Sequence, residues 1–411
     1  MRPRSIAIVG GGPGGLMTAY RLQTRASVAH RTTIFEATPR IGGKILTKRF
    51  GRADARYEAG AAEFYDYTPV GEDALKELVL ELGLAVNPMR GGQVIAGDRV
   101  LETLDDVRAH LGADAERALR AFDRQARDRI SPGEFYHAGE HAPAAPAGTF
   151  DAFLTAALPH PRAREYVEHL VHSDLATEPH KTSAEYGLHN YLMNHPAYMH
   201  LYSIEGGNEL LPRALAARLN ATVLLNHPVQ SVERLRGGRL RVSAAPGGER
   251  YAEDFDFVVI ALPQSALNGV EFRGARLREA MAMHADRYDF PAHYLRVTIL
   301  FDRPFWGRVL RDGFAMLDRF GGCCLYDESS REPGAKHHVL GWLLGGAAAE
   351  ELSDLGDDEL VGRALESLPA ALAHGKARVV EAHVHRWVGS VNALPGGRVH
   401  ASLDRRHRPE P

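Results

Sequence analysis

The hydrophobic pattern at the start of the chain predicts a strand, a helix and a second strand in close succession. Residues 5–10 form an apolar run, rich in β-branched side chains, that ends in glycine, as buried parallel strands often do. Residues 14–25 place apolar side chains on one side of a helix, and residues 32–36 form a second strand-like run. The three elements span about 32 residues, which is the size of one βαβ unit.

Helical and strand-like patterns continue along the rest of the chain. Helices are predicted over residues 70–83, 104–130, 150–195, 207–219 and 356–373. Strands are predicted near 93–101, over 221–225, 229–235, 239–243, 256–262 and 377–388, and as antiparallel-looking runs between 293 and 345. The Ala-, Pro- and Gly-rich residues 138–149 predict a loop or linker. This order indicates a nucleotide-binding layer that is interrupted by a second, mixed domain.

A glycine-rich turn joins the first predicted strand to the first predicted helix. Gly10, Gly12 and Gly15 occupy the positions of a G-x-G-x-x-G motif, and Pro13 and Gly14 lie between the last two. The first glycine permits a tight turn, the second lets the backbone approach a pyrophosphate, and the third allows close packing of helix on strand. A phosphate would then bind the N-terminal end of the helix, where backbone N–H groups are unpaired.

The second predicted strand ends in an acidic residue, Glu36. From that position a carboxylate can accept hydrogen bonds from both hydroxyl groups of a ribose. Because a strand precedes the glycines and a helix follows them, the pattern favours a dinucleotide site. The alternative is an ordinary glycine-rich turn beside a surface glutamate.

The composition narrows the class of protein. Of the 411 residues, 45% are hydrophobic and 25% are charged, which is typical of a folded globular chain. The formal net charge of −3 gives no basic excess that would favour nucleic acid as a partner. No apolar run is long enough to span a membrane, and the N-terminus leaves no room for a signal peptide. Cys323 and Cys324 are adjacent and form no disulfide framework, so we expect a reducing, cytoplasmic location.

The residues after Glu36 distinguish a flavin site from a simple nicotinamide site. Residues 36–45 read EATPRIGGKI and resemble the E-x-x-x-R-x-G-G-[RK] segment of the FAD-dependent monoamine oxidase and L-amino-acid oxidase family. The resemblance implies that FAD is the cofactor, that the paired glycines lie along its diphosphate, and that a cation offsets the phosphate charge. The residues involved would be Ala37, Arg40, Gly42, Gly43 and Lys44. The alternative is a surface loop after a strand.

Further segments carry the same resemblance. Residues 57–64, YEAGAAEF, resemble the family segment that passes beside the flavin ring, with Gly60 and Ala61 as the small contacting residues. Residues 203–219 resemble the glycine turn and helix with which the family re-enters its FAD domain. Two single positions complete the match, namely Val229, whose backbone would hold the adenine end, and Pro263, which ends the family's following strand.

By this resemblance the fold is α/β, with a Rossmann-like FAD-binding domain of the GR2 type and an inserted mixed α+β substrate domain. We expect the FAD-binding domain at residues 1–70 and 201–265, a mostly helical substrate region at 71–200, an antiparallel-sheet substrate domain at 266–390 and a polar tail at 391–411.

The resemblance implies oxidation of a small-molecule amine or amino acid by hydride transfer to flavin N5. Many family members place a lysine near N5, on a strand that runs into a P-[FW]-W motif. Here residues 304–306 form that motif, and Arg296 occupies the lysine position. Arginine stays protonated and cannot act as a base, although it could orient water or bind a carboxylate. Trp387 lies where the family often places an aromatic residue in the wall that faces the flavin.

Aromatic and histidine side chains are concentrated between residues 185 and 202, on the substrate side of the family's layout. Tyr191, His195 and Tyr202 are candidates for an aromatic cage around an amine or an amino-acid side chain. The alternative is a helix with core and surface aromatics. No metal site is expected, because the histidines lack an i, i+4 pair with acidic support.

The end of the chain departs from the family pattern. The family normally closes with a glycine-acid segment and a helix N-terminus that cover the flavin, beyond a block that corresponds here to residues 385–397. We find no such segment before the final RRHRPEP. The expectation is therefore a truncation point within 391–411, a second chain or homo-oligomer that completes the FAD site, or compromised flavin binding.

Two other functions are compatible with the same scaffold. Arg296 in place of lysine would suit an FAD-dependent C–C desaturase, similar to carotenoid desaturases or protoporphyrinogen oxidase, which would need an apolar tunnel. The incomplete C-terminal pattern would suit a non-enzymatic protein, as in the Rab GDP-dissociation inhibitors. The intact glycine fingerprint argues against the second alternative, because a scaffold without a nucleotide needs no positioned glycines.

Overall fold

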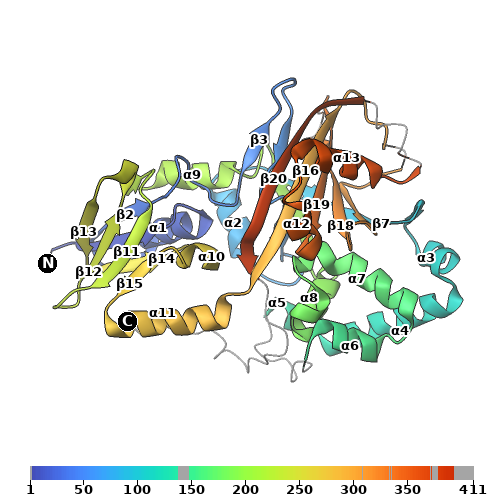
Figure 1. Ribbon diagram of the computed structural model, residues 1–411, viewed down its shortest axis with the longest axis horizontal. Helices are drawn as coiled ribbons and strands as arrows, with labels where there is room; N and C mark the ends of the chain where they lie inside the picture. Colours follow the sequence, from blue (N-terminus) through green and yellow to red (C-terminus); the bar gives the residue numbers. More distant parts are fainter. Residues whose placement is uncertain are drawn as a thin grey trace.

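The computed structural model describes most of the chain, which is folded into two lobes (Figure 1). The described residues are 2–137, 148–307, 309–332, 334, 336–370, 372 and 378–392. Most of the predicted linker at 138–149, and all but the first two residues of the predicted tail at 391–411, lie outside them. One lobe is built on a parallel sheet, and the other is built on a large mixed sheet (Figure 1).

The first lobe contains the βαβ unit that the opening residues predict. Strand β1 (Arg4–Val9) pairs in parallel with β2 (His30–Phe35), and helix α1 (Pro13–Arg25) connects the two strands. The sheet continues in parallel with β10 (Thr222–Leu224) next to β2 and with β14 (Phe257–Ile260) next to β1. The central residues of β1 and the end of β2 are buried, so the apolar runs correctly predicted strands with little solvent contact.

A smaller sheet packs beside the parallel sheet in the same lobe. Its strands, in spatial order, are β13 (Tyr251–Phe255), β12 (Leu240–Ala244), β11 (Val229–Arg234) and β15 (Glu271–Arg273). The two sheets share a buried cluster that includes Phe35 and Val242. Strand β15 comes from the segment that we expected to belong to the substrate side, 266–390, yet it pairs with β11. The short helix α10 (Gln264–Leu267) lies between β14 and β15 in sequence, so the chain stays in this lobe.

Helices complete the first lobe. Helix α9 (Leu210–Arg218), which the sequence predicts, packs against α1. Helix α11 (Ala275–Tyr288) follows β15 along the lower edge of the lobe, and no apolar pattern predicted it (Figure 1). Ala280 is the one fully buried residue among its described side chains, with Leu277 and Met281 half-buried beside it, so the helix packs on the lobe through a short, weakly apolar face.

The second lobe is organised around a seven-stranded sheet. Its strands, in spatial order, are β20 (Val379–Asn392), β16 (Pro291–Phe301), β19 (His338–Gly345), β18 (Cys323–Asp327), β17 (Phe314–Leu317), β7 (Gly91–Ala96) and β8 (Arg99–Leu101). Neighbouring strands are antiparallel except for β17 and β7, which run in parallel. Because β7 and β8 come from the expected helical region, 71–200, that region and the expected sheet domain share one sheet.

The segments that connect the parallel sheet to the seven-stranded sheet form two small sheets. One consists of β3 (Thr47–Arg49) and β4 (Arg56–Glu58), and the other consists of β5 (Phe64–Asp66), β9 (His200–Ile204) and β6 (Val86–Met89). Helix α2 (Ala74–Glu81) lies between β5 and β6 in sequence. Asp73 caps α2 by accepting hydrogen bonds from the backbone N–H groups of its first turn.

Helices cover both faces of the seven-stranded sheet. On one face lie α3 (Leu104–Leu111), α4 (Ala113–Arg129), α5 (Pro132–Tyr136), α6 (Phe150–Ala157), α7 (Pro161–Leu175) and α8 (Ala184–Met193), and on the other lie α12 (Gly346–Leu352) and α13 (Asp357–Glu366). The single helix predicted over 104–130 breaks at Gly112, whose φ of 100° ends α3. Prolines divide the stretch predicted over 150–195, because Pro161 starts α7 and Pro179 starts a short 3-10 turn.

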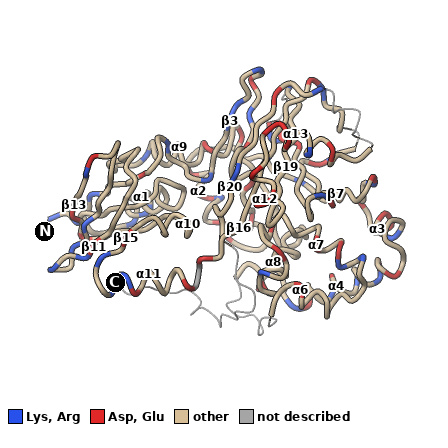
Figure 2. The backbone as a smooth tube through the Cα atoms, viewed as in Figure 1, with Lys and Arg blue, Asp and Glu red and all other residues tan. Residues whose placement is uncertain are grey.

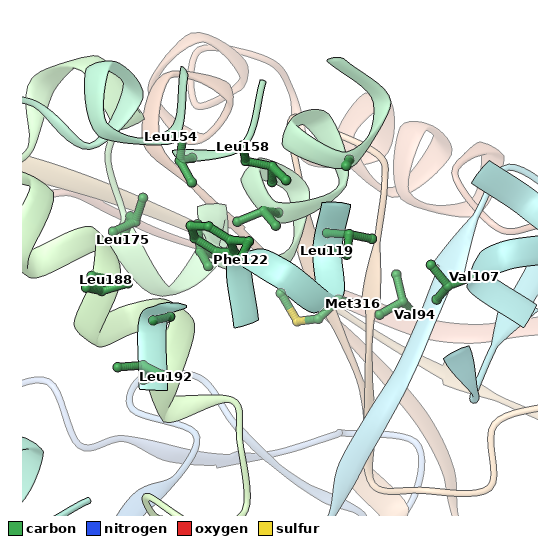
Figure 3. Close-up of a cluster of buried hydrophobic side chains, with 14 of the residues drawn as sticks. Val94, Val107, Leu119, Phe122, Leu154, Leu158, Leu175, Leu188, Leu192 and Met316 are labelled. Atoms are coloured by element: carbon green, nitrogen blue, oxygen red, sulfur yellow. The ribbon is translucent and has the colours of Figure 1, made fainter. Parts of the chain in front are cut away.

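The largest buried cluster lies between the sheet and helices α4, α6, α7 and α8. Figure 3 shows Phe122 of α4 surrounded by leucines from the neighbouring helices, including Leu154, Leu175 and Leu188. Met316 of β17 closes the cluster on the side of the sheet (Figure 3). The alternate residues of β17 and β18 face α12 and α13 instead, so side-chain alternation along these strands serves two separate cores.

Charged residues of both signs are distributed over the whole backbone rather than concentrated in one basic region (Figure 2). This distribution, seen along the residues that the structure describes, fits the small net charge of −3. Among the residues that the structure describes, no helix combines the length and apolar character that crossing a membrane requires.

Candidate active site

Steric contacts require two of the fingerprint glycines. Gly10 has a φ of 111°, and a Cβ on it would lie 2.6 Å from the carbonyl oxygen of Ala261. A Cβ on Gly15 would lie only 2.0 Å from the carbonyl oxygen of Gly10. Both distances are far shorter than a van der Waals contact, so any larger side chain would displace the turn between β1 and α1.

The middle of the fingerprint leaves backbone exposed to a ligand. A Cβ on Gly12 would meet only the Cα of Gly43, at 3.8 Å, and a Cβ on Gly14 would meet no described atom within 4 Å. Pro13 is the first residue of α1, no side chain in the described part of the chain caps this helix, and its first turn carries no acidic residue. The N-terminus of α1 therefore fits a diphosphate, which it can bind through free N–H groups and the helix dipole.

Glu36 lies beside this turn and is already held by three hydrogen bonds. Its Oε2 accepts from the backbone N–H of Gly11 at 2.8 Å, and its Oε1 accepts from the N–H and hydroxyl of Thr38 at 2.9 and 2.7 Å. A carboxylate offers about four lone-pair sites, so Oε2 retains one for a further donor. The side chain is 8% exposed and fits the position of a ribose acceptor, next to the exposed Ala37.

The second glycine pair packs against the first. The N–H of Gly42 donates to the carbonyl oxygen of Gly11 at 2.9 Å, and Gly42 has a φ of 101°. A Cβ on Gly43 would lie 3.1 Å from the Cα of Gly12. The two glycine loops thus lie back to back, which explains why both need glycine and keeps the cradle rigid.

The cations after Glu36 contact backbone carbonyl groups, and their role in offsetting the phosphate charge stays a prediction. The guanidinium group of Arg40 donates to the carbonyl oxygens of Gly43 at 2.5 Å and Ile41 at 3.2 Å. Lys44 donates through Nζ to the carbonyl oxygen of Ser390 in β20 at 2.6 Å, and burial lowers its pKa. Both side chains therefore bind backbone carbonyl oxygens in the structure. Within the described ranges, the group that remains free to bind the phosphates is the N-terminus of α1, with its unpaired N–H groups and positive dipole end.

Residues 57–61 form the segment that the resemblance assigns to the flavin ring. A Cβ on Gly60 would lie 2.0 Å from the carbonyl oxygen of Lys44, to which the N–H of Ala61 donates at 2.9 Å. The indole N–H of Trp387 donates to the carbonyl oxygen of Ala59 at 2.7 Å. Trp387 of β20 is therefore fixed beside this segment, where an aromatic wall was expected.

A buried acid and an amide organise the same segment, and the sequence did not single them out as a pair. Glu58 accepts hydrogen bonds from the backbone N–H of Asn208 at 2.8 Å and from the hydroxyl of Thr47 at 2.9 Å. The Asn208 side chain donates to the carbonyl oxygens of Ala61 and Ala62, each at 3.0 Å. Burial raises the pKa of Glu58 to about 7. Two features of the sequence could have pointed to this pair. Glu58 is an acid inside an Ala- and Gly-rich run, and Asn208 follows a Gly-Gly turn.

Val229 and Pro263 each follow a segment that contacts the fingerprint region. Val229 begins β11, and the preceding His227 donates its N–H to the carbonyl oxygen of Glu36 at 2.8 Å. Pro263 is exposed and precedes α10 at the carboxyl end of β14. Dinucleotides bind at the carboxyl ends of parallel strands in such sheets, so both residues lie at the expected edge.

Arg296 lies at the centre of a buried charge network. Its side chain on β16 is 0% exposed and forms an ion pair with Glu328, which also pairs with Nε of Arg331 at 2.8 Å. Both guanidinium groups lie over the ring of Tyr326, at 5.0 and 5.1 Å from its centroid. Burial alone would raise the pKa of Glu328, but Arg331 and Arg296 hold it below its usual range. The carboxylate that Arg296 binds in the structure is therefore that of Glu328, a residue of the same chain.

A cavity of about 500 Å³ adjoins this network. Its charged lining residues are Glu63, Asp66, Asp174 and Arg90, and much of its remaining wall is apolar and contains four methionines. The hydroxyl group of Tyr326 donates to Oε1 of Glu63 at 3.2 Å, which links the cavity to the network around Arg296. Burial raises the pKa of Glu63 and raises that of Asp174 to about 7. A larger, more open groove of about 770 Å³ along α1 and α2 has no carboxylate among its described lining residues.

The aromatic cage predicted from Tyr191, His195 and Tyr202 is not the lining of this cavity. Tyr191 packs against Phe122 in the helical core, with a distance of 4.9 Å between the ring centroids. Tyr202 is 1% exposed and stacks on Phe64, and Nδ1 of His195 accepts a hydrogen bond from its own turn. These three residues lie on the core faces of α8 and β9 or in the turn between them, so the structure does not bring them together around the cavity, and their role toward a substrate stays a prediction.

Replacing Asp174 with asparagine tests the raised pKa directly. Between about pH 4 and pH 7 the folded state binds a proton at Asp174 that the unfolded state has released, so the wild type loses stability as the pH rises. An asparagine side chain does not titrate, so the stability of Asp174→Asn relative to the wild type should rise across that range, by up to about 1.4 kcal/mol for each tenfold fall in proton concentration. Denaturant unfolding at several pH values measures the difference, and a difference independent of pH would contradict the assignment.

A dinucleotide cradle in one lobe, joined by residues 57–63 to an acidic cavity in the other, is the organisation of an α/β flavoprotein oxidoreductase. The chain belongs to the family of flavin containing amine oxidoreductases, whose family model matches residues 13–409. It is therefore an enzyme of amine or amino-acid oxidation with FAD as its cofactor, which excludes the non-enzymatic alternative.

Individual relatives agree with the family. The chain is 23% identical to an L-amino-acid oxidase from Siganus canaliculatus over 87% of this chain and 70% of that protein. It is 23% identical to a flavin-dependent L-tryptophan oxidase from Lentzea aerocolonigenes over 78% of this chain and 69% of that protein. The solved structure of cyclohexylamine oxidase from Brevibacterium oxydans is similar in fold, with a TM-score of 0.72 and 19% identity over 98% of this chain and 90% of that chain.

Proposed function

We propose that this protein oxidises a small amine or amino acid, with FAD held in the glycine cradle and the substrate held in the acidic cavity. The observation that carries the proposal is the continuity of one segment. Gly60 and Ala61 are the residues we propose to contact the flavin ring, and Glu63 lines the cavity two residues later. The residues proposed to hold FAD are Gly10, Gly12, Pro13, Gly14, Gly15, Glu36, Ala37, Gly42, Gly43, Gly60, Ala61, Val229 and Pro263, with Arg40 and Lys44 fixing the loop. When bound, the flavin supplies a hydride acceptor at N5.

The groups of the chain itself bind the amine, orient it and take up its proton. An amine must be neutral to lose a hydride from the adjacent carbon, whereas in water near neutral pH it is protonated. A carboxylate with a pKa raised toward 7, such as that of Asp174, is matched to accept this proton. Arg296 is ion-paired and permanently charged, so we assign it a positioning role toward Tyr326 and Glu328 rather than that of a base.

The test is a flavin-loading and turnover experiment. The full chain is incubated with FAD, separated from free flavin by gel filtration, and exposed to amines and amino acids in air. We expect a flavin absorbance that stays with the protein, and release of hydrogen peroxide when substrate is added. A flavin-loaded protein that no amine or amino acid reduces would contradict the proposal and would favour the C–C desaturase alternative.

The proposal extends to the organisation of the chain. The FAD-binding parts would be 1–70 and 201–265, extended to include β15, and the substrate side would be 71–200 and the rest of 266–390. A cytoplasmic location is supported by Cys323 and Cys324, the two cysteines of the chain, which are free and buried. Recovery of the native protein with both thiols reduced, after mild lysis under thiol-trapping conditions, is the expected result.

Association with a second copy or another chain is also part of the proposal. Two sheet edges carry exposed apolar side chains, because Phe257 on β14 is 55% exposed and Val388 on β20 is 42% exposed. Light scattering with and without FAD measures the mass in solution, and we expect a mass above that of one chain. A monomer that binds FAD would remove this part of the proposal alone.

A further inference from the structure

The two carboxylates that line the cavity differ from the other buried acids of the chain. Glu63 accepts one hydrogen bond, from Tyr326, and its Oε2 is buried without a donor among the described residues. A buried carboxylate oxygen without a donor is costly unless a ligand satisfies it. Glu63 follows directly on the segment assigned to the flavin ring, so a donor at Oε2 would lie near the reacting end of a substrate.

Asp174, near the end of α7, is the second of these carboxylates. Its Oδ2 accepts from the Asn194 side chain at 3.0 Å, and the charge of Glu63 contributes to the rise in its pKa, although burial contributes more. The pKa of Tyr294 is raised by burial and by a group of neighbours that includes Tyr186, Asp174 and Glu63. The two acids are therefore close enough to interact and are surrounded by tyrosines, whose ring faces attract cations.

The basic groups near the cavity do not cancel these charges inside it. Asp66 lines the cavity but is neutralised by Lys76, whose Nζ lies 2.6 Å from Oδ2. Arg296 and Arg331 lower the pKa of Glu63, yet they share Glu328 and neither lines the cavity. Arg90 does line it, with a side chain that is exposed to solvent. The charge that a buried substrate would meet is therefore negative.

We infer that Glu63 and Asp174 select amines that carry no carboxylate, so that this enzyme oxidises simple amines in preference to amino acids. The inference rests on the proposed function and adds its substrate class. A substrate ammonium would satisfy Oε2 of Glu63, whereas an amino-acid carboxylate would be repelled by both acids. The carbon chain would contact the methionines of the wall, Met89, Met193, Met199 and Met316, which adapt to varied apolar shapes.

The experiment compares two ligands that differ only in the carboxylate, 2-phenylethylamine and L-phenylalanine. Each is titrated by calorimetry into the FAD-loaded full chain in the absence of oxygen, and flavin reduction is recorded separately. We expect the amine to bind at least about tenfold more tightly than the amino acid. In the double variant Glu63→Gln, Asp174→Asn, amine affinity should fall at least about tenfold, and the preference for the amine should narrow.

Two further variants complete the test, one that perturbs Glu63 indirectly and one that serves as a control. Tyr326→Phe removes the hydrogen bond to Glu63, so it should weaken amine binding several-fold even if the double variant does not fold. Glu332→Gln removes a partly exposed carboxylate outside the cavity wall and should change nothing. Equal or tighter binding of the amino acid, or unchanged amine affinity in all variants, would overturn the inference. Flavin that binds but is reduced by neither ligand class would instead overturn the proposed function.

Discussion

The Gly15→Ala variant should lose FAD binding altogether. The added Cβ would lie 2.0 Å from the carbonyl oxygen of Gly10, so either the start of α1 or the turn that precedes it must move. Gly10 in turn lies against Ala261, so the turn cannot shift in that direction. Because the phosphates need the N–H groups of this turn in fixed positions, even a small displacement removes the cradle.

Flavin-fluorescence titration measures this loss, and circular dichroism shows whether the variant is folded. The matched control is Gly14→Ala, one residue away, whose Cβ would meet no described atom within 4 Å and which continues a helix. We expect Gly14→Ala to retain FAD. Equal FAD affinity in Gly15→Ala and the wild type would contradict the assignment of the cradle.

The second large effect is expected at Glu328. The Glu328→Gln variant leaves Arg296 and Arg331 buried around the same ring without their shared counter-charge. Removing one partner of a buried ion pair typically costs about 3–5 kcal/mol, because the remaining charge stays desolvated. We therefore expect a loss of that order in the free energy of unfolding, measured by denaturant titration.

Glu332→Gln is the control for this variant. Glu332 pairs with Arg56, and its side chain is 35% exposed, so its loss should cost no more than about 1 kcal/mol. Equal free energies of unfolding for Glu328→Gln and Glu332→Gln would show that the ion pairs of Glu328 do not stabilise the network around Tyr326. Loss of stability in Glu328→Gln with amine oxidation retained at low temperature would still agree with the positioning role of Arg296.

The local parts of the fold could be predicted from the sequence. The βαβ unit and the glycine fingerprint depend on neighbouring residues, so apolar runs and glycine spacing define them. The pairing of β7 with β17 joins segments more than 200 residues apart, and no local pattern carries that information. The same holds for the pairing of β15 with β11, which are separated in sequence by β12, β13 and β14.

The residues of the candidate site also fall into two groups, those that a local sequence pattern predicts and those that only the fold brings together. The cradle and Glu36 could be proposed from the sequence because their chemistry lies within one contiguous stretch of chain. Glu63 and Asp174 are 111 residues apart and meet only through the fold, so neither stood out. Tyr191 and Tyr202 were selected by composition, which does not reveal which face of α8 or β9 is turned to the core. Arg296 was found by its spacing from Pro304, but its partner Glu328 lies on another element.

The most direct test of the central claim is the spectrum of the FAD-loaded chain in the absence of oxygen. Addition of a stoichiometric amount of 2-phenylethylamine should bleach the flavin absorbance, and admission of air should restore it with release of hydrogen peroxide. Gly15→Ala treated in the same way should retain no flavin to bleach. A wild-type protein that binds FAD and shows no change with any amine would contradict the account.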